Sequence, residues 1–148
     1  MEIQANELMI GDWVLLDGEP YQIRQLGIYG VDRDGEDYAA VCVGKPNGVG
    51  LIVERNEIEP IPLTPEILEK NGFVANKHVY PYPYYEYEDK QIKVRVGFAF
   101  PQGNRTSYKK PWVYIDTECV YIEHLPCINV HQLQHALRLC GTEKEVRL

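Results

Sequence analysis

The stretch 58-IEPIPLTPEILEKNGF-73 carries the clearest local signals in the chain. Thr64 can cap a helix, and Pro65 follows at the first helical position, where its missing N–H costs nothing. Gly72 suits the left-handed residue that ends a helix. The pattern therefore predicts a two-turn helix over about 65–71.

The sixty residues before this helix contain short apolar runs broken by turns, which is typical of a small barrel or sandwich. Asp17-Gly18 separates two of these runs and predicts a β-hairpin. The expected strands are 13–16, 21–26, 38–43, 51–53 and 57–61. Because five short strands in this arrangement resemble an SH3-like barrel, we expect residues 1–62 to form a subdomain of that kind.

The remainder, residues 63–148, is predicted to be an α+β subdomain in which an antiparallel sheet lies between a short and a longer helix. Asn129 and Gln132 form the pair of a capping box and Gly141 ends the second helix, which is expected over about 130–140. A further edge strand is expected at 145–148. The strands of the sheet are expected at 79–87, 91–100, 112–116 and 119–125.

The second predicted helix carries His131 and His135 at the spacing of the zinc-protease motif H-E-x-x-H. Gln132 stands where that motif needs a glutamate base, and Arg138 beside the pair would repel a metal ion. At 100° per residue, the apolar side chains fall on one arc and both histidines on the other. We therefore expect the histidines to face solvent, and we predict neither a metal site nor a cofactor.

The sequence gives only weak signals for other catalytic arrangements. Cys119, His124, Cys127 and His131 lie close together in the sequence but follow no zinc-finger spacing. A Cys127–His131 pair at a helix start is conceivable as nucleophile and base, so a small hydrolase or metal-dependent enzyme stays open as the least favoured function. The single serine, Ser107, lacks the G-x-S-x-G context of a hydrolase. No catalytic residue is predicted.

The run 80-YPYPYYEY-87 has the most unusual composition in the chain. Prolines two residues apart do not suit a central strand, so the run is expected at a sheet edge or as an extended surface segment. Tyrosines are common in contact surfaces for proteins, sugars and unstacked bases. The candidate binding residues are Tyr82, Tyr84, Tyr85 and Tyr87, together with His131 and Gln134 near the capped end of the second helix.

The chain carries a net charge of −7, from 15 Lys and Arg against 22 Asp and Glu. Its basic residues are scattered apart from Lys109-Lys110, which disfavours a nucleic-acid partner because phosphate backbones are bound by clustered cations. A nucleic-acid accessory factor nevertheless remains the alternative function, with Arg105, Lys109, Lys110 and the tyrosines as a local patch.

Several features favour a cytoplasmic protein with no membrane partner. No apolar run approaches the ~20 residues that cross a bilayer, and the N-terminal residues show no secretory signal pattern. The four cysteines are dispersed and contain no C-x-x-C pair, which suits reduced thiols.

Three further segments stand out along the chain: 6-NEL-8 with 10-IGDWV-14, 58-IEPIPLTPEIL-68 with 71-NGF-73, and 130-VHQLQ-134 with Gly141. Together they resemble a family of small proteins of unknown function that are encoded in bacterial genomes, phages and mobile elements. The likeness covers the whole chain in order, and no activity comes with it. Our leading hypothesis is a non-enzymatic accessory or adaptor protein that binds another protein or a second copy of itself.

Overall fold

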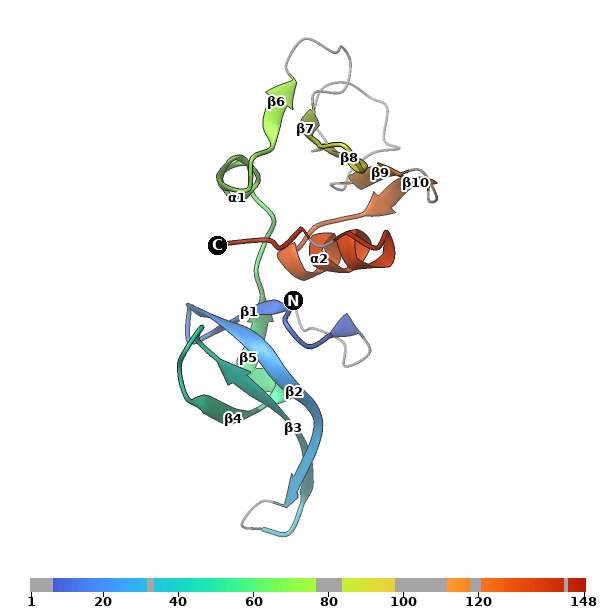
Figure 1. Cartoon of the computed structure of the whole chain (residues 1–148). Coiled ribbons are helices and arrows are strands. Elements are labelled where there is room, and N and C mark those ends of the chain that lie inside the picture. Colours follow the sequence, from blue (N-terminus) through green and yellow to red (C-terminus); the bar gives the residue numbers. More distant parts are fainter. Residues whose placement is uncertain (1–6, 32–33, 77–83, 98–111, 118–120, 143) are drawn as a thin grey trace, which may run out of the picture. The chain divides into compact units, whose positions relative to one another are not determined.

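The chain divides into two compact units, Met1–Ile61 and Pro62–Leu148, which we treat separately (Figure 1). The structure is a computed structural model that describes residues 7–31, 34–76, 84–97, 112–117, 121–142 and 144–148, with the backbone alone for 121–126.

Unit 1 is a five-stranded antiparallel sheet in the order β4-β3-β2-β1-β5. Asp17 and Gly18 both have positive φ, 51° and 77°, which is the geometry of the tight hairpin turn that the sequence predicts. The strands are β1 (Trp13–Leu16), β2 (Glu19–Val31), β3 (Asp37–Gly44), β4 (Gly50–Glu54) and β5 (Ile58–Pro60), with a 3₁₀ turn at Arg55–Glu57.

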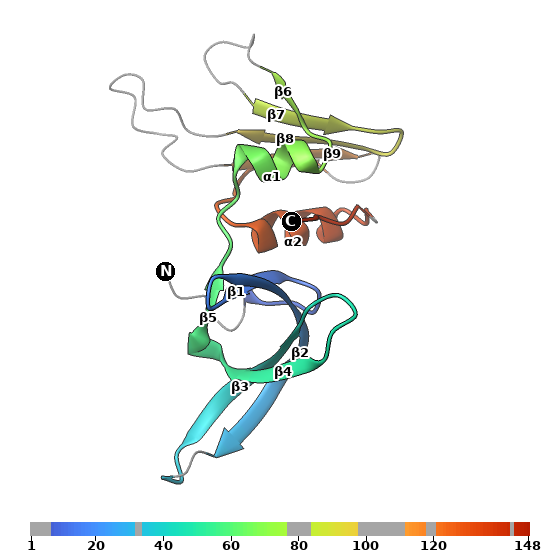
Figure 2. The ribbon, with the colours of Figure 1, turned by 90° about the vertical axis from the view of Figure 1, so that its left-hand side faces the viewer.

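The sheet of unit 1 is strongly curved (Figure 2). The register between β2 and β3 shifts twice, and Gly27 has a φ of 71° at the second shift, as expected for a bulge that bends a strand. Leu8, Val14, Ile23 and Val43 are among the buried residues inside the curve. Among the described residues β4 and β5 are not paired with each other, so closure of the sheet into the predicted barrel is not seen.

The IGDWV segment has a structural role in unit 1. Asp12 is fully buried, and its Oδ2 accepts a hydrogen bond from the Met9 N–H at 2.7 Å. Backbone hydrogen bonds join Gly11 and Asp12 to Ile23 at 2.7 and 2.9 Å. Gly11 has a φ of 87°, which favours glycine. The segment thus fixes the chain at its entry into β1.

Unit 2 is an α+β unit with a second antiparallel sheet, in the order β10-β9-β8-β7-β6. Both helices lie on the same side of this sheet (Figures 1 and 2). The elements are α1 (Pro65–Lys70), β6 (Val74–Asn76), β7 (Tyr84–Glu88), β8 (Ile92–Gly97), β9 (Trp112–Thr117), β10 (Tyr121–Pro126) and α2 (Val130–Leu139).

The helix ends follow the sequence signals. Thr64 Oγ1 accepts the Ile67 N–H at 3.4 Å, and the Phe73 N–H donates to the Leu68 carbonyl at 3.0 Å beyond α1. At α2, Gln132 Oε1 accepts the Asn129 N–H at 3.1 Å. These contacts confirm the predicted caps, which satisfy backbone groups that a helix leaves unpaired.

Two strand predictions are wrong. Tyr84–Glu88 (β7) is not an edge strand, because it pairs with both β8 and the short edge strand β6. Residues 80–83, on which the rest of the prediction for this run depends, lie outside the described residues. The segment 145–148 forms no strand among the described residues; its backbone at Arg147 is instead bonded by the Asn71 side chain in both directions. A side-chain amide can replace a strand partner because it offers one donor group and one acceptor.

The expected solvent exposure of His131 is also wrong. Leu133 and Leu137 are fully buried and Arg138 is exposed, as predicted. His131, in contrast, is only 1% exposed, and Gln134 is buried too. The His131 ring meets the His135 ring edge-on at 5.7 Å. An arc of apolar residues shows which side of a helix must be buried, but it does not require the other side to be exposed.

Candidate binding surface on the second sheet

The second sheet has two chemically different faces because side chains alternate along each strand. Val94, Val96, Val113 and Ile115 are buried. They share a face with Tyr85, which bonds Glu69 of α1, so this is the side on which the helices lie. The residues of opposite parity form what we call the outer face: Val74, Asn76, Tyr84, Glu86, Glu88, Lys93, Arg95, Gly97, Trp112, Tyr114 and Asp116.

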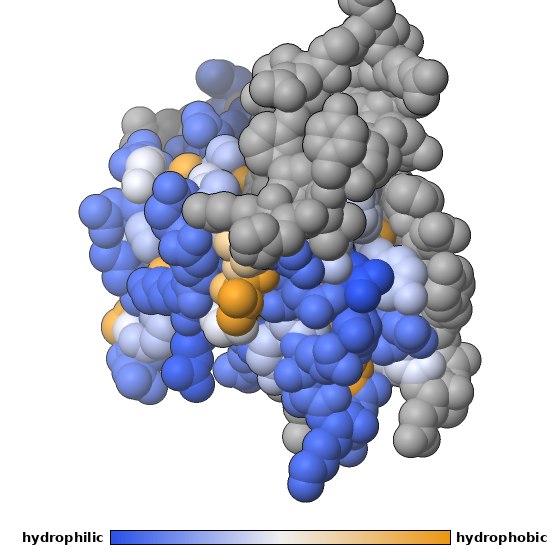
Figure 3. All heavy atoms as spheres, turned by 90° about the horizontal axis from the view of Figure 1, so that it is seen from above, coloured by the Kyte–Doolittle hydropathy of each residue, from blue (hydrophilic) through white to orange (hydrophobic). Residues whose placement is uncertain are grey.

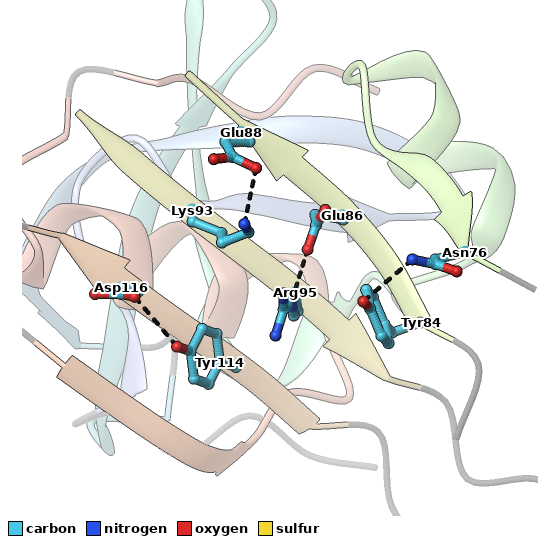
Figure 4. Close-up of polar contacts among 8 residues, drawn as sticks. All are labelled: Asn76, Tyr84, Glu86, Glu88, Lys93, Arg95, Tyr114 and Asp116. Carbon is cyan, nitrogen blue, oxygen red and sulfur yellow. Dashed lines mark hydrogen bonds and ion pairs between the residues drawn. The ribbon is translucent and has the colours of Figure 1, made fainter. Parts of the chain in front are cut away.

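Arg95 stands at the centre of the outer face (Figure 4). Its Nε donates to Glu86 Oε2 at 2.5 Å across the β7–β8 pair. Its guanidinium carbon lies 5.0 Å from the centroid of the Tyr84 ring and 5.4 Å from that of the Tyr114 ring. Both distances are in the range of cation–π attraction, so Arg95 links the aromatic side chains of two strands.

Trp112 lies against the backbone of Gly97, its neighbour in the register. A Cβ at position 97 would stand only 2.2 Å from the indole ring, which no side chain tolerates. Tyr84 pairs with Gly97 from the other side. Because glycine has no side chain, the indole ring of Trp112 can lie over position 97, which stands between Trp112 and Tyr84.

Hydrogen bonds hold the rest of the outer face (Figure 4). Asn76 Nδ2 lies 3.1 Å from the Tyr84 hydroxyl, and Tyr114 lies 3.3 Å from Asp116. Lys93 forms an ion pair with Glu88 at 2.9 Å. The described outer face carries two cations, Lys93 and Arg95, and three carboxylates, so its charge is nearly balanced.

The predicted tyrosines divide between the two faces of the sheet. Tyr84 joins the outer face, whereas Tyr85 hydrogen-bonds to Glu69 of α1 at 3.4 Å. Tyr87 packs on Phe73, with ring centroids 5.6 Å apart, and bonds to Asp89. Tyr82 lies outside the described residues.

The other two predicted binding residues do not join the outer face. His131 and Gln134 belong to α2, which lies on the opposite side of the sheet. The sequence reasoning missed Arg95, Gly97, Trp112 and Tyr114. The strict alternation in 92-IKVRVG-97 was the available signal, since it marks Lys93, Arg95 and Gly97 as one face.

The structure describes only some of the alternative catalytic residues. No three described His, Cys, Asp or Glu side chains could hold a metal ion together. Cys127 is fully buried, and burial raises the pKa of its thiol to about 12. Six candidates lie outside the described residues: Ser107, Cys119, Arg105, Lys109, Lys110 and the side chain of His124.

We expect Cys127 to react with a thiol reagent at neutral pH at least about a hundred times more slowly than Cys42, because the thiolate is the reactive form and Cys127 is inaccessible. Cys42 is half-buried and serves as the internal control. Mass spectrometry of the alkylated peptides over time measures both rates. Equal rates would contradict the buried position, and denaturant should make them converge.

A scan against protein-family models and searches of curated proteins and of solved structures found no match. The resemblance to the bacterial and phage family therefore stays a prediction. Among the described residues, no helix has both the length and the apolar character needed to span a bilayer.

Proposed function

We propose that this protein is a non-enzymatic adaptor that binds a partner protein through the outer face of its second sheet. The observation that carries the proposal is the cluster of Tyr84, Arg95 and Tyr114 beside Trp112. Tyrosine, tryptophan and arginine are the side chains that most often dominate the binding energy of protein interfaces.

The contacts within the outer face favour binding for a second reason. Arg95 is held by Glu86, and the Tyr84 hydroxyl by Asn76. Side chains that are already ordered lose less conformational entropy when a partner binds. The mixed charges fit a protein surface of mixed charge better than a polyanion.

The composition of the outer face supports a polar type of contact, because Glu86, Glu88, Lys93, Arg95 and Asp116 all belong to it. In Figure 3 the described residues that grey atoms leave visible are mainly hydrophilic. A large apolar patch would indicate an obligate interface. We therefore infer an adaptor that exchanges partners rather than a permanent subunit.

Three further assignments are proposals: the barrel fold of unit 1, the cellular location and the origin of the protein. We infer that unit 1 is an SH3-like barrel, a proposal supported by its meander order and by the 3₁₀ turn before the last strand. Location in the cytoplasm is supported by the dispersed cysteines, and a phage or mobile-element origin by the resemblance alone.

An affinity pull-down tests the function with a matched pair of variants. Tyr84→Ser combined with Tyr114→Ser should abolish retention of a partner, whereas Tyr29→Ser should keep it, because Tyr29 is 82% exposed but belongs to unit 1. Light scattering after size exclusion shows whether the partner is a second copy. Equal retention by all variants, or a monomer that retains nothing, would sink the proposal.

A single-strand nucleic-acid partner is the second candidate, because aromatic rings and an arginine on a sheet face can also stack on unpaired bases. Three carboxylates on the same face oppose it. Fluorescence anisotropy with single-stranded DNA and RNA separates the two functions. Salt-sensitive binding that Trp112→Ala removes would favour nucleic acid, and absence of binding at low salt would exclude it.

A further inference from the structure

A hollow of about 370 Å³ opens in unit 2, away from the residues of the outer face. It is lined by Lys70, Asn71, Lys144, Glu145 and Arg147, and therefore holds three cations and one carboxylate. A local excess of positive charge is unusual in a chain whose net charge is −7.

The Asn71 side chain joins the two segments that line the hollow by hydrogen bonds. Its Nδ2 donates to the Arg147 carbonyl at 2.7 Å, and its Oδ1 accepts the Arg147 N–H at 2.7 Å. The same Nδ2 lies 2.7 Å from the Ile67 carbonyl of α1. The segment that carries Lys144 and Arg147 is thereby tied to the end of the helix that carries Lys70.

Lys144 is the most constrained of the three cations. Its Nζ lies 3.8 Å from the centroid of the Tyr87 ring and 6.0 Å from that of Phe73. Burial is the main reason why the pKa of Lys144 falls below its ordinary value; the charge of Arg147 lowers it further and Asp89 opposes the fall. An anion in the hollow would relieve the repulsion between the two cations.

The other two cations differ in their surroundings. Lys70 donates a hydrogen bond to a backbone oxygen of Leu148, so part of its hydrogen-bonding capacity is already used. Arg147 is exposed and offers a planar fork that matches two oxygens of one anion.

We propose that this hollow binds a small oxyanion, and that a phosphate group is the ligand. Phosphate presents several oxygens at once, so Lys144, Arg147 and Lys70 can contact it together. The site lies on unit 2 alone and does not depend on the proposed adaptor function.

Isothermal titration with inorganic phosphate at low ionic strength tests the site. We expect saturable binding with a Kd of about 1 mM or tighter. Lys144→Met combined with Arg147→Gln should weaken it at least about tenfold, as lost ionic hydrogen bonds would. Lys93→Met on the outer face should leave it unchanged. Absence of saturable binding, or an unchanged Kd in the double variant, would overturn the proposal.

Two further variants and a second readout sharpen the test. Glu145→Gln should tighten binding, because it removes the one carboxylate that lines the hollow; weaker binding would count against the site. Phosphate should also raise the pKa of Lys144, measured by NMR in the wild-type protein, and an unchanged pKa at saturation would contradict direct contact. This readout holds even if the double variant fails to fold.

Phosphoserine and adenosine monophosphate serve as parallel ligands because both carry the same group. Tighter binding of either than of inorganic phosphate identifies what presents the phosphate. Binding of either one that survives in the double variant would contradict the site.

Discussion

Replacing Asn71 by alanine is expected to lower the free energy of unfolding of unit 2 by about 3 kcal/mol, because a buried amide that makes several hydrogen bonds leaves its partners unsatisfied. Asn71 is buried, and it bonds Arg147 in both directions as well as the Ile67 carbonyl. Urea unfolding followed by Trp112 fluorescence in a Trp13→Phe background measures the loss, since Trp112 belongs to unit 2.

Asn76→Ala is the matched control for that substitution. Asn76 is half-buried, and its amide bonds the Tyr84 hydroxyl at 3.1 Å. We expect a loss of about 1 kcal/mol or less, as for one ordinary hydrogen bond. If Asn71→Ala is no more destabilising than Asn76→Ala, the Asn71 side chain does not hold the C-terminal segment as described.

Gly97→Ala is expected to drive the Trp112 ring from its place on the outer face. The added Cβ would stand 2.2 Å from the indole, and overpacking of this kind costs about 1–3 kcal/mol. The ring should become more exposed, so its fluorescence emission should move to longer wavelength. Retention of a partner should fall to background, because the arrangement of Trp112 with the two tyrosines is lost.

A double-mutant cycle identifies the cause of that effect. In a Trp112→Ala background the large ring is absent, so Gly97→Ala should cost much less stability than it does alone. Equal losses in the two backgrounds would mean that the position needs glycine for its backbone and not for the ring. Circular dichroism reports stability in all four proteins.

The fold could be predicted where the signals are local. Thr64, Pro65 and Gly72 define α1 through capping chemistry, and Asp17-Gly18 defines the first hairpin through its positive φ values. The position of a strand within its sheet was harder to predict. The prolines suggested an edge, but Tyr84–Glu88 pairs on both sides, and the three-residue strand β6 is too short to give a pattern.

The candidate surface was only partly predictable because it is assembled across strands. Tyr84 was found from composition, but Arg95, Trp112 and Tyr114 become its neighbours only through the pairing of β7, β8 and β9. Register cannot be read from one strand alone. The opposite failure occurred at His131, where the apolar arc gave no sign that His131 and Gln134, outside the arc, are buried as well.

Site-directed photo-cross-linking tests most directly whether the outer face binds a protein. A photoreactive amino acid in place of Lys93 lies on that face, and one in place of Lys45 lies on the exposed β3–β4 turn of unit 1. We predict a covalent adduct with a partner protein from position 93 and none from position 45. Adducts of equal yield from both positions, or none from position 93 while the pull-down retains the partner, would contradict the account.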